Sequence, residues 1–502
     1  MRCIATAIII LSVAALPALA SSATIYVSPT GNDVTGDGSQ GNPYQTIMCA
    51  IFEARHKDTI VVAPGTYYEN LLVWKKSVRL TSTDPDNSAV VESTIISGGA
   101  NSLPAVTLYG GRAGSSVVTG FTITGGEAPV GGGIFCYRCS PLITKNVITG
   151  NRATEVEPYT GGGGICCAFA SPTISYCTIS NNTSLRMGGG VACFLPSKAK
   201  ILHCTFTSNQ AGGGGGGISF LMASGVVSDC TFEDNDTTAW DGGAILVQWR
   251  AKVDISNCLI AGNSANGGGG ICFIEKMGGS PSGSVRNCVI RNNFASYGGG
   301  GMHLQQTRRV DIINSLIAGN TCHGAGAGIL AAGPGDTRVT NCTIVQNSSD
   351  SAYEAGGGLG IGWEHRAFVE NNILWGNSCP KGPQVGVWQS KPVTFGFNDI
   401  QGDRAAFYED NPKIKWLAGN TDVDPLFANP GSSGDGDYHL QSTSGRWDPS
   451  ANAGAGAWIA DLADSPCIDA GNPKSKFRNE PEPNGGRINM GAYGNTPSAS
   501  KS

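Results

Sequence analysis

The chain has 502 residues, of which 40% are hydrophobic, 14% are charged and 73 are glycine, and its formal net charge is −5. This acidic balance argues against nucleic acid and anionic membrane surfaces as partners. No apolar stretch after residue 20 approaches the length of a spanning helix, which excludes a membrane-integrated helical protein.

Residues 1–20 have the pattern of a secretory signal peptide. Arg2 precedes a largely apolar run from Ile4 to Leu16, and Ala18 and Ala20 form an Ala-x-Ala cleavage site. The sequence therefore predicts a secreted protein, extracellular or periplasmic, and leaves attachment to a cell surface open.

Residues 21–100 are predicted to form an N-terminal cap and the first coils of a solenoid. The segment 24–28 is rich in β-branched residues and predicts a strand, and 58–62 predicts another. Between them, apolar residues recur at helical spacing from Tyr44 to Arg55. An amphipathic helix laid across the open end of a solenoid covers its core and its unpaired strand edges.

Residues 101–402 contain a repeat in which a run of glycines is followed by one aliphatic residue. These residues are Ile134, Ile165, Val191, Ile218, Ile245, Ile271, Met302, Ile329 and Leu359. A second column, later in each unit, consists of Asn151, Asn182, Asn209, Asn235, Asn263, Asn293, Asn320, Asn347 and Asn377. The spacings between successive members change in parallel in the two series. Each repeat is therefore one structural unit, and its length varies in the loops.

Short β-branched segments bounded by Gly, Asn or Ser fill each unit, such as 253–260 and 283–290. No unit has an apolar stripe of helical period, which excludes helical solenoids. The repeat length suits three short strands and three turns per coil, stacked roughly 4.8 Å apart. The sequence therefore predicts an all-β fold, a right-handed parallel β-helix.

Thiols dominate the column five residues before each Asn. Its members are Asn146, Cys177, Cys204, Cys230, Cys258, Cys288, Ser315, Cys342 and Asn372. We predict that the thiols pack in the interior as small unbridged hydrophobes, with disulfides as the rival interpretation. The Asn amides are predicted to bond to one another along the axis and to satisfy a sharp turn.

Residues 403–502 no longer show the repeat and are rich in Gly, Asp, Asn and Pro. We expect them to form C-terminal coils and a capping segment that closes the other end. The mature chain is then one elongated domain, which we expect to be a monomer.

Several segments resemble the pectin lyase-like superfamily of right-handed parallel β-helix proteins. The entry segment from Tyr26 to Ile47 and the segment from Asp58 to Asn70 resemble its N-terminal cap and first coil. The segments 465–471 and 485–493 resemble the closing part of exported bacterial members. Residues 232–235 and 242–245 resemble the repeat of polymorphic outer-membrane proteins, whose autotransporter barrel is not expected here.

This resemblance implies the fold and a choice among polysaccharide lyases, glycoside hydrolases, epimerases, tailspikes and non-catalytic adhesins. The chain has no acidic or histidine pairs of the polygalacturonase kind. It also has no acidic cluster on successive repeats that would suit calcium, so no metal site and no cofactor are predicted, and Ca²⁺ is left open as an alternative.

A functional site in a solenoid is expected where one coil departs from its neighbours. The coil of Ile245 has charged and aromatic residues where others have glycine. In this coil and the next, the predicted catalytic residues are Asp236, Asp241, Arg250 and Lys276, and the predicted substrate-binding residues are Trp240, Trp249 and Glu275. A second departure from the repeat, after Leu359, adds Trp363 and His365 as predicted substrate-binding residues, with His365 at an exposed loop tip. An aromatic platform beside charged groups suits a sugar ring, and two cations suit a uronate carboxylate. The competing interpretation is a solvated, salt-bridged loop.

Two functions follow from these observations. The first is a protein that binds, and as an enzyme would also depolymerise, a polysaccharide along a groove beside the post-glycine strands, by lyase or glycoside hydrolase chemistry. The alternative is a non-catalytic adhesin, matrix or surface structural protein. Convergence of the four predicted catalytic side chains on one cleft favours the enzyme, because glycosidase carboxylates lie within about 10 Å of each other.

Overall fold

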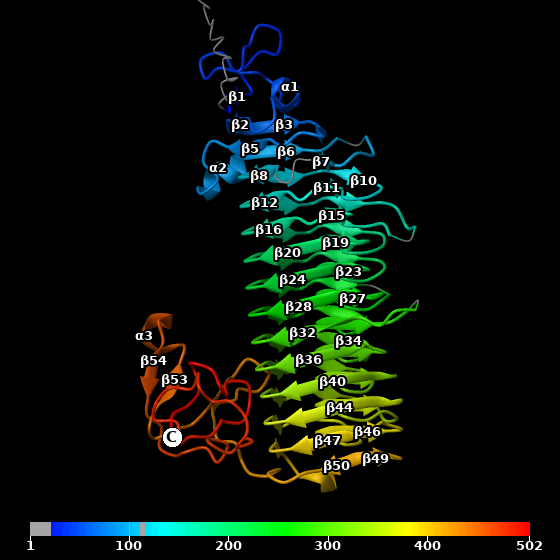
Figure 1. Ribbon diagram of the computed structural model, residues 1–502, viewed down its shortest axis with the longest axis vertical. Coiled ribbons are helices and arrows are strands. Elements are labelled where there is room, and N and C mark those ends of the chain that lie inside the picture. Colours follow the sequence, from blue (N-terminus) through cyan, green and yellow to red (C-terminus); the bar gives the residue numbers. More distant parts are fainter. Residues whose placement is uncertain (1–21, 100, 111–115, 158, 238, 277) are drawn as a thin grey trace, which may run out of the picture.

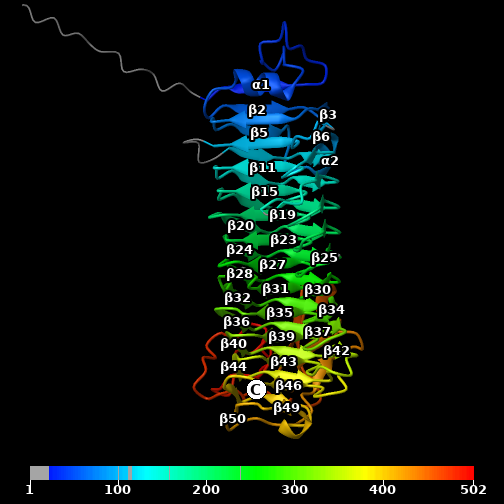
Figure 2. The same ribbon diagram turned by 90° about the vertical axis from the view of Figure 1, so that its right-hand side faces the viewer.

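The computed structural model describes residues 22–99, 101–110, 116–157, 159–237, 239–276 and 278–502. They form a parallel β-helix whose coils stack along one long axis (Figures 1 and 2). Three sheets run along most of it: 15 strands from β1 (Thr24–Val27) to β50 (Ile414–Trp416), 13 from β4 (Leu71–Trp74) to β49 (Tyr408–Asp410), and 13 from β3 (Gly65–Tyr68) to β48 (Asp399–Ile400). The all-β solenoid prediction is confirmed. The predicted signal peptide lies outside the described residues.

One coil shows how the sequence repeat becomes structure. It contains β27 (Ile245–Gln248), β28 (Lys252–Ser256), β29 (Leu259–Ala261) and β30 (Ser264–Gly267). The short β30 corrects the prediction of three strands per coil. It belongs to a nine-stranded sheet that runs from β10 (Glu127–Ala128) to β42 (Ser348–Ser349). Residues just after the Asn column stay extended and pair from coil to coil.

The post-glycine residues pair in the register that the repeat predicts. Ile245 lies beside Ile218 on one side and Ile271 on the other, and each points into the core with no exposed surface. We call the 13-stranded sheet that contains β27 the post-glycine sheet. Aliphatic side chains from the three long sheets fill the interior along its whole length.

The thiol column lies in this interior. Its six cysteines are at most 3% exposed, and all are free thiols: Cys177, Cys204, Cys230, Cys258, Cys288 and Cys342. Their sulfurs contact backbone carbonyls, as Cys258 Sγ does at 3.1 Å from the carbonyl oxygen of Ser256. The prediction of an unbridged ladder is confirmed.

The Asn column forms a continuous hydrogen-bonded ladder. From Asn151 to Asn377, each amide nitrogen donates to the amide oxygen of the next Asn at 2.9–3.0 Å. The same oxygen accepts the preceding backbone N–H at 2.9–3.2 Å. The ladder therefore provides hydrogen-bond acceptors for buried backbone N–H groups at the turns, where strand pairing provides none.

A short helix lies at the N-terminal end of the solenoid. Helix α1 (Ile47–Glu53) begins after Thr46, whose hydroxyl accepts the N–H of Cys49 at 3.2 Å. The Glu69 carboxylate accepts the N–H groups of Ile47 and Met48, each at 2.9 Å. A further helix, α2 (Ser88–Ser93), lies beside the early coils. Within the described ranges, no helix is both long and apolar enough to cross a membrane.

The C-terminal segment, predicted to form the last coils and a cap, takes a path that the sequence did not reveal. Strands β49 and β50 still stack on the last coil, but the chain then returns along the flank (Figure 1). It carries β51 (Phe427–Asn429) paired with β52 (Asp437–Leu440), and β53 (Arg446–Asp448) paired with β54 (Ala457–Ile459). Apolar side chains such as Tyr438 and Met490 cover outward residues of the β3–β48 sheet, including Leu316 and Val345.

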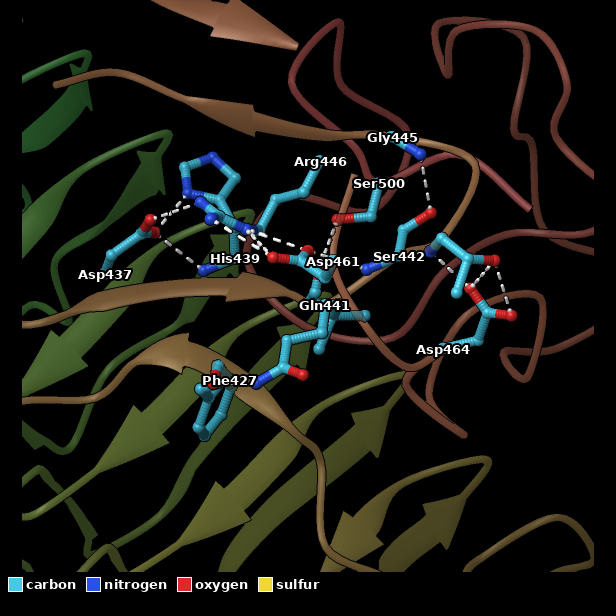
Figure 3. A network of polar contacts seen from close by, with 12 residues as sticks. Phe427, Asp437, His439, Gln441, Ser442, Gly445, Arg446, Asp461, Asp464 and Ser500 are labelled. Atoms are coloured by element: carbon cyan, nitrogen blue, oxygen red, sulfur yellow. Dashed lines mark hydrogen bonds and ion pairs between the residues drawn. The ribbon is translucent and has the colours of Figure 1, made fainter. Parts of the chain in front are cut away.

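A buried arginine holds this returning segment together (Figure 3). Arg446 is 6% exposed and lies 2.8 Å from Asp437 and 3.1 Å from Asp461. Asp437 also contacts His439 at 2.6 Å. Two carboxylates therefore surround one buried guanidinium, which fits the fork geometry that arginine provides.

Docking of the C-terminal segment should weaken as the pH rises from about 4 to about 7. Burial raises the pKa of Asp399, which accepts from Cys467 of the segment, to about 6. Burial also raises the pKa of Glu480 to about 7. Because both folded pKa values lie above the unfolded ones, the native state binds more protons in this window and loses stability as the groups ionise.

The difference between the folded and unfolded pKa of each group corresponds to roughly 3 kcal/mol of folding stability. Thermal unfolding at pH 5 and pH 7.5 checks the effect. The double variant Asp399→Asn and Glu480→Gln mimics the protonated state and should unfold with less pH dependence. An unchanged pH dependence in that variant would show that other groups govern it.

Candidate ligand-binding site

The outward face of the post-glycine sheet is buried over several coils. All four residues are buried in β19 (Val191–Phe194), β23 (Ile218–Leu221), β27 and β31 (Ile271–Ile274). Their outward side chains form a second apolar cluster, separate from the solenoid interior, which includes Phe194, Leu221 and Leu246. Loops that precede the glycine runs therefore cover this face.

A pocket of about 320 Å³ opens between these loops and the sheet. We call it the ligand pocket; it is lined by Tyr159, Arg186, Met187, Leu221, Trp240, Gln248, Trp249 and Lys276. The predicted residues Trp240, Trp249 and Lys276 are thus brought together.

The walls of the ligand pocket combine aromatic faces with two cations. Lys276 Nζ lies 4.0 Å from the centre of the Trp240 ring, and the Arg186 guanidinium lies 5.5 Å from it. Tyr159 and Trp249 form a tilted pair with ring centres 5.6 Å apart. Arg186 Nε and Trp249 Nε1 are buried donors without a hydrogen-bond partner among the described residues. Both atoms are therefore available to donate a hydrogen bond to an acceptor outside the described residues.

Asp241 lies beneath this pocket. Its Oδ2 accepts from Lys276 Nζ at 2.6 Å, and its side chain is 8% exposed. Neighbouring coils place Met187, Gly214 and Gly267 at this position, as their bridge pairing shows. The ion pair orients the Lys276 ammonium between Asp241 and the Trp240 ring.

The other residues predicted for this coil lie elsewhere. Asp236, in β26 (Asp236–Thr237), is bound by Ser264 and Gln210 of adjacent coils. Arg250 donates to the carbonyl oxygen of Gly278 at 3.3 Å, and Glu275 accepts from the backbone of Gly278. None of these three charged residues lines the ligand pocket. The four predicted catalytic side chains therefore do not share this pocket, although Asp241 and Lys276 meet.

Trp363 and His365 lie near the last coils. Trp363 is 40% exposed and packs edge-on against Trp388, beside a second pocket of about 190 Å³. His365, expected at an exposed loop tip, has no exposed surface, and this expectation was wrong. It starts β44 (His365–Glu370), where its ring nitrogens contact Thr337 at 2.8 Å and the Gly333 carbonyl at 2.9 Å. His365 therefore lies inside the protein at the start of a strand and not at a loop tip.

Sequence reasoning missed five lining residues, including Tyr159 and Arg186, and one polar cluster. Tyr159 and Arg186 come from the loops of earlier coils, and the repeat spacing does not predict how these loops fold over the sheet. The cluster is Asp241, Cys272 and His303, whose possible ligand atoms lie within 4.8 Å of one another. Burial lowers the pKa of His303 to about 4, so the imidazole is neutral at pH 7. The sequence offered one signal, because Cys272 and His303 each follow a post-glycine residue on successive coils.

Comparison with known proteins places the chain in a family. Residues 81–225 and 216–400 match the family described as right handed beta helix region. Residues 29–72 match a family described as a protein of unknown function, DUF1565. The first match spans more than half of the sequence, so the chain belongs to the right-handed β-helix family, as predicted. No curated protein matches the sequence significantly.

Solved structures show distant likeness. A pectate lyase, Pel9A, is 14% identical, with 94% of this chain and 96% of that chain covered and a TM-score of 0.33. XylC in complex with xylose is 9% identical, with coverages of 81% and 87% and a TM-score of 0.37. A rhamnogalacturonan lyase is 13% identical, with coverages of 82% and 91% and a TM-score of 0.33.

Proposed function

We propose that this protein is an exported glycan-binding β-helix protein whose ligand pocket holds an acidic sugar unit of a polysaccharide. The observation that carries the proposal is the pairing of aromatic walls with the Arg186 and Lys276 cations around a pocket of about 320 Å³. Fractionation of expressing cells tests export, and retention of the protein in the cytoplasm would contradict it.

Each part of the pocket matches one part of such a ligand. The rings of Tyr159, Trp240 and Trp249 offer apolar faces for the C–H surface of a sugar ring. Arg186 presents donors that suit a carboxylate, and Lys276 adds a second positive charge. The unpartnered Trp249 Nε1 is available to a hydroxyl or carboxylate oxygen.

The pocket favours binding over hydrolysis. Glycoside hydrolysis uses two carboxyl groups that flank the scissile bond. The lining contains no Asp or Glu, and the nearby Asp241 carboxylate is buried under Lys276. The alternative to binding alone is that the protein cleaves the polysaccharide by elimination at a uronate. This reaction would leave an unsaturated sugar that absorbs ultraviolet light.

Substitution at Arg186 tests the proposal. Arg186→Met keeps the apolar stem but removes the charge and should weaken binding of polygalacturonate about tenfold to a hundredfold, the worth of one charge-assisted hydrogen bond. Isothermal titration calorimetry measures the affinity, and an absorbance assay on the same mixture detects elimination. Arg286→Met is the matched control, because Arg286 is exposed on β32 (Ser282–Arg286) of another sheet.

Trp240→Ala should weaken binding of acidic and neutral glycans alike, since it removes a stacking surface. Arg186→Met should act on acidic glycans alone. Equal affinity of all variants, or no binding of any acidic polysaccharide by the native protein, would refute the proposal and leave a structural or adhesive role.

A further inference from the structure

Beside the ligand pocket, a buried cluster contains three different metal-ligating side chains. Asp241 precedes β27, Cys272 lies in β31, and His303 lies in β35 (Met302–Gln305). All three are buried, and one ligand atom from each lies within 4.8 Å of the others. Cys272 and His303 are register partners on adjacent strands and both point outward from the sheet, away from the solenoid interior.

The imidazole of His303 is unexplained by the fold. The residue is 2% exposed, yet its Nδ1 atom has no hydrogen-bond partner among the described residues. A buried polar atom without a partner carries a penalty that structures normally avoid. The buried histidine His365 illustrates the contrast, because both of its ring nitrogens are satisfied.

Gly267 leaves space between two of the ligand atoms. A Cβ atom at this position would lie 2.7 Å from both Asp241 Oδ1 and His303 Nδ1. Any other residue would therefore occupy the gap toward which the carboxylate and the imidazole converge. The pairing of β30 with β34 (Phe294–Gly298) is irregular between Ala265 and Gly267, so the coil departs from its repeat at this point.

We propose that Asp241, Cys272 and His303 form a binding site for a transition metal ion of the zinc type. A carboxylate oxygen, a thiolate and an imidazole nitrogen are ligands that zinc accepts, and three protein ligands leave a fourth position open. Tetrahedral bonds of about 2.0–2.3 Å place ligand atoms roughly 3.5 Å apart, so binding draws the three side chains together by about an ångström. The Cys272 thiol gives up its proton on binding.

Lys276 supports the proposed metal site by holding the Asp241 carboxylate in place. It binds Asp241 Oδ2, so Oδ1 remains directed toward Gly267 and the gap. An ammonium on the second oxygen of a ligating carboxylate orients that carboxylate, as outer-shell partners of metal ligands do. The proposal does not depend on what the ligand pocket binds.

Titration of the purified full-length protein with Co²⁺ tests the site. We expect one equivalent to bind with a thiolate-to-cobalt absorption band in the near ultraviolet, and Zn²⁺ to abolish that band by competition. Cys272→Ser should remove the band, and His303→Gln should weaken binding at least tenfold. Cys166→Ser is the matched control, since Cys166 is buried at the same outward position on β15 (Ile165–Ala168) and should leave the band unchanged.

Circular dichroism of each variant verifies the fold. Absence of a cobalt–thiolate band in the folded native protein would overturn the proposal. A band that persists in both Cys272→Ser and His303→Gln would also overturn it and would assign the metal to other thiols. If Cys272→Ser does not fold, the His303→Gln titration decides alone.

Discussion

Replacement of Asn263 by leucine should unfold the middle of the solenoid. The Asn263 amide donates to the carbonyl oxygen of Phe232 at 3.1 Å and to Asn293 Oδ1 at 2.9 Å. Its oxygen accepts the backbone N–H and the side-chain amide of Asn235, each at 2.9 Å. Leucine would remove these four hydrogen bonds and would leave the buried backbone N–H of Asn235 without its acceptor, at about 1–2 kcal/mol for each lost bond.

The summed effect is roughly 4–8 kcal/mol, enough to abolish cooperative folding of the affected coils. Denaturant unfolding followed by circular dichroism measures it. The control Asn266→Leu makes the same change at an exposed position of the same coil and should alter stability by less than about 0.5 kcal/mol. Equal stability of the two variants would show that the ladder is not a main source of stability.

Replacing a thiol of the column by a charged group should destabilise the protein far more than removing the thiol. Cys258 is 3% exposed and packs in the solenoid core. Cys258→Ala leaves a small cavity and should cost about 1–2 kcal/mol. Cys258→Asp buries a carboxylate without a cation and should cost at least about 4 kcal/mol, unfolding its coil and its neighbours.

Thiol alkylation followed by mass spectrometry gives an independent check of the same column. In the native protein, the six column cysteines should resist alkylation, and they should react after unfolding in denaturant. Rapid labelling of the native protein, or similar stabilities of Cys258→Ala and Cys258→Asp, would contradict a buried thiol column.

The fold was predictable because a solenoid repeats its constraints. Every coil must place an aliphatic residue at the position of Ile245 and an amide at the position of Asn263, so the spacing alone reveals register and interior. The N-terminal helix was predictable for a similar reason, since its apolar spacing is local. The fourth strand was missed because it is short, with only two residues in β10, β26 and β42, and so few residues carry too little pattern to indicate a strand.

The ligand pocket was only partly predictable. Trp240, Trp249 and Lys276 stood out as departures from the repeat, and the structure brings them together. Tyr159 and Arg186 also line the pocket, from loops two or more coils away. The spacing of the sequence repeat does not predict the direction in which such a loop folds. The return of residues 421–502 along the flank depends on packing between distant segments, such as Tyr438 on the β3–β48 sheet.

A crystal structure of the protein soaked with an oligogalacturonate would show directly whether the ligand pocket holds an acidic sugar. We expect a sugar ring against Trp240 or Trp249, with its carboxylate within hydrogen-bond distance of Arg186 or Lys276. A sugar bound on another face, or an empty ligand pocket at saturating oligosaccharide, would contradict it.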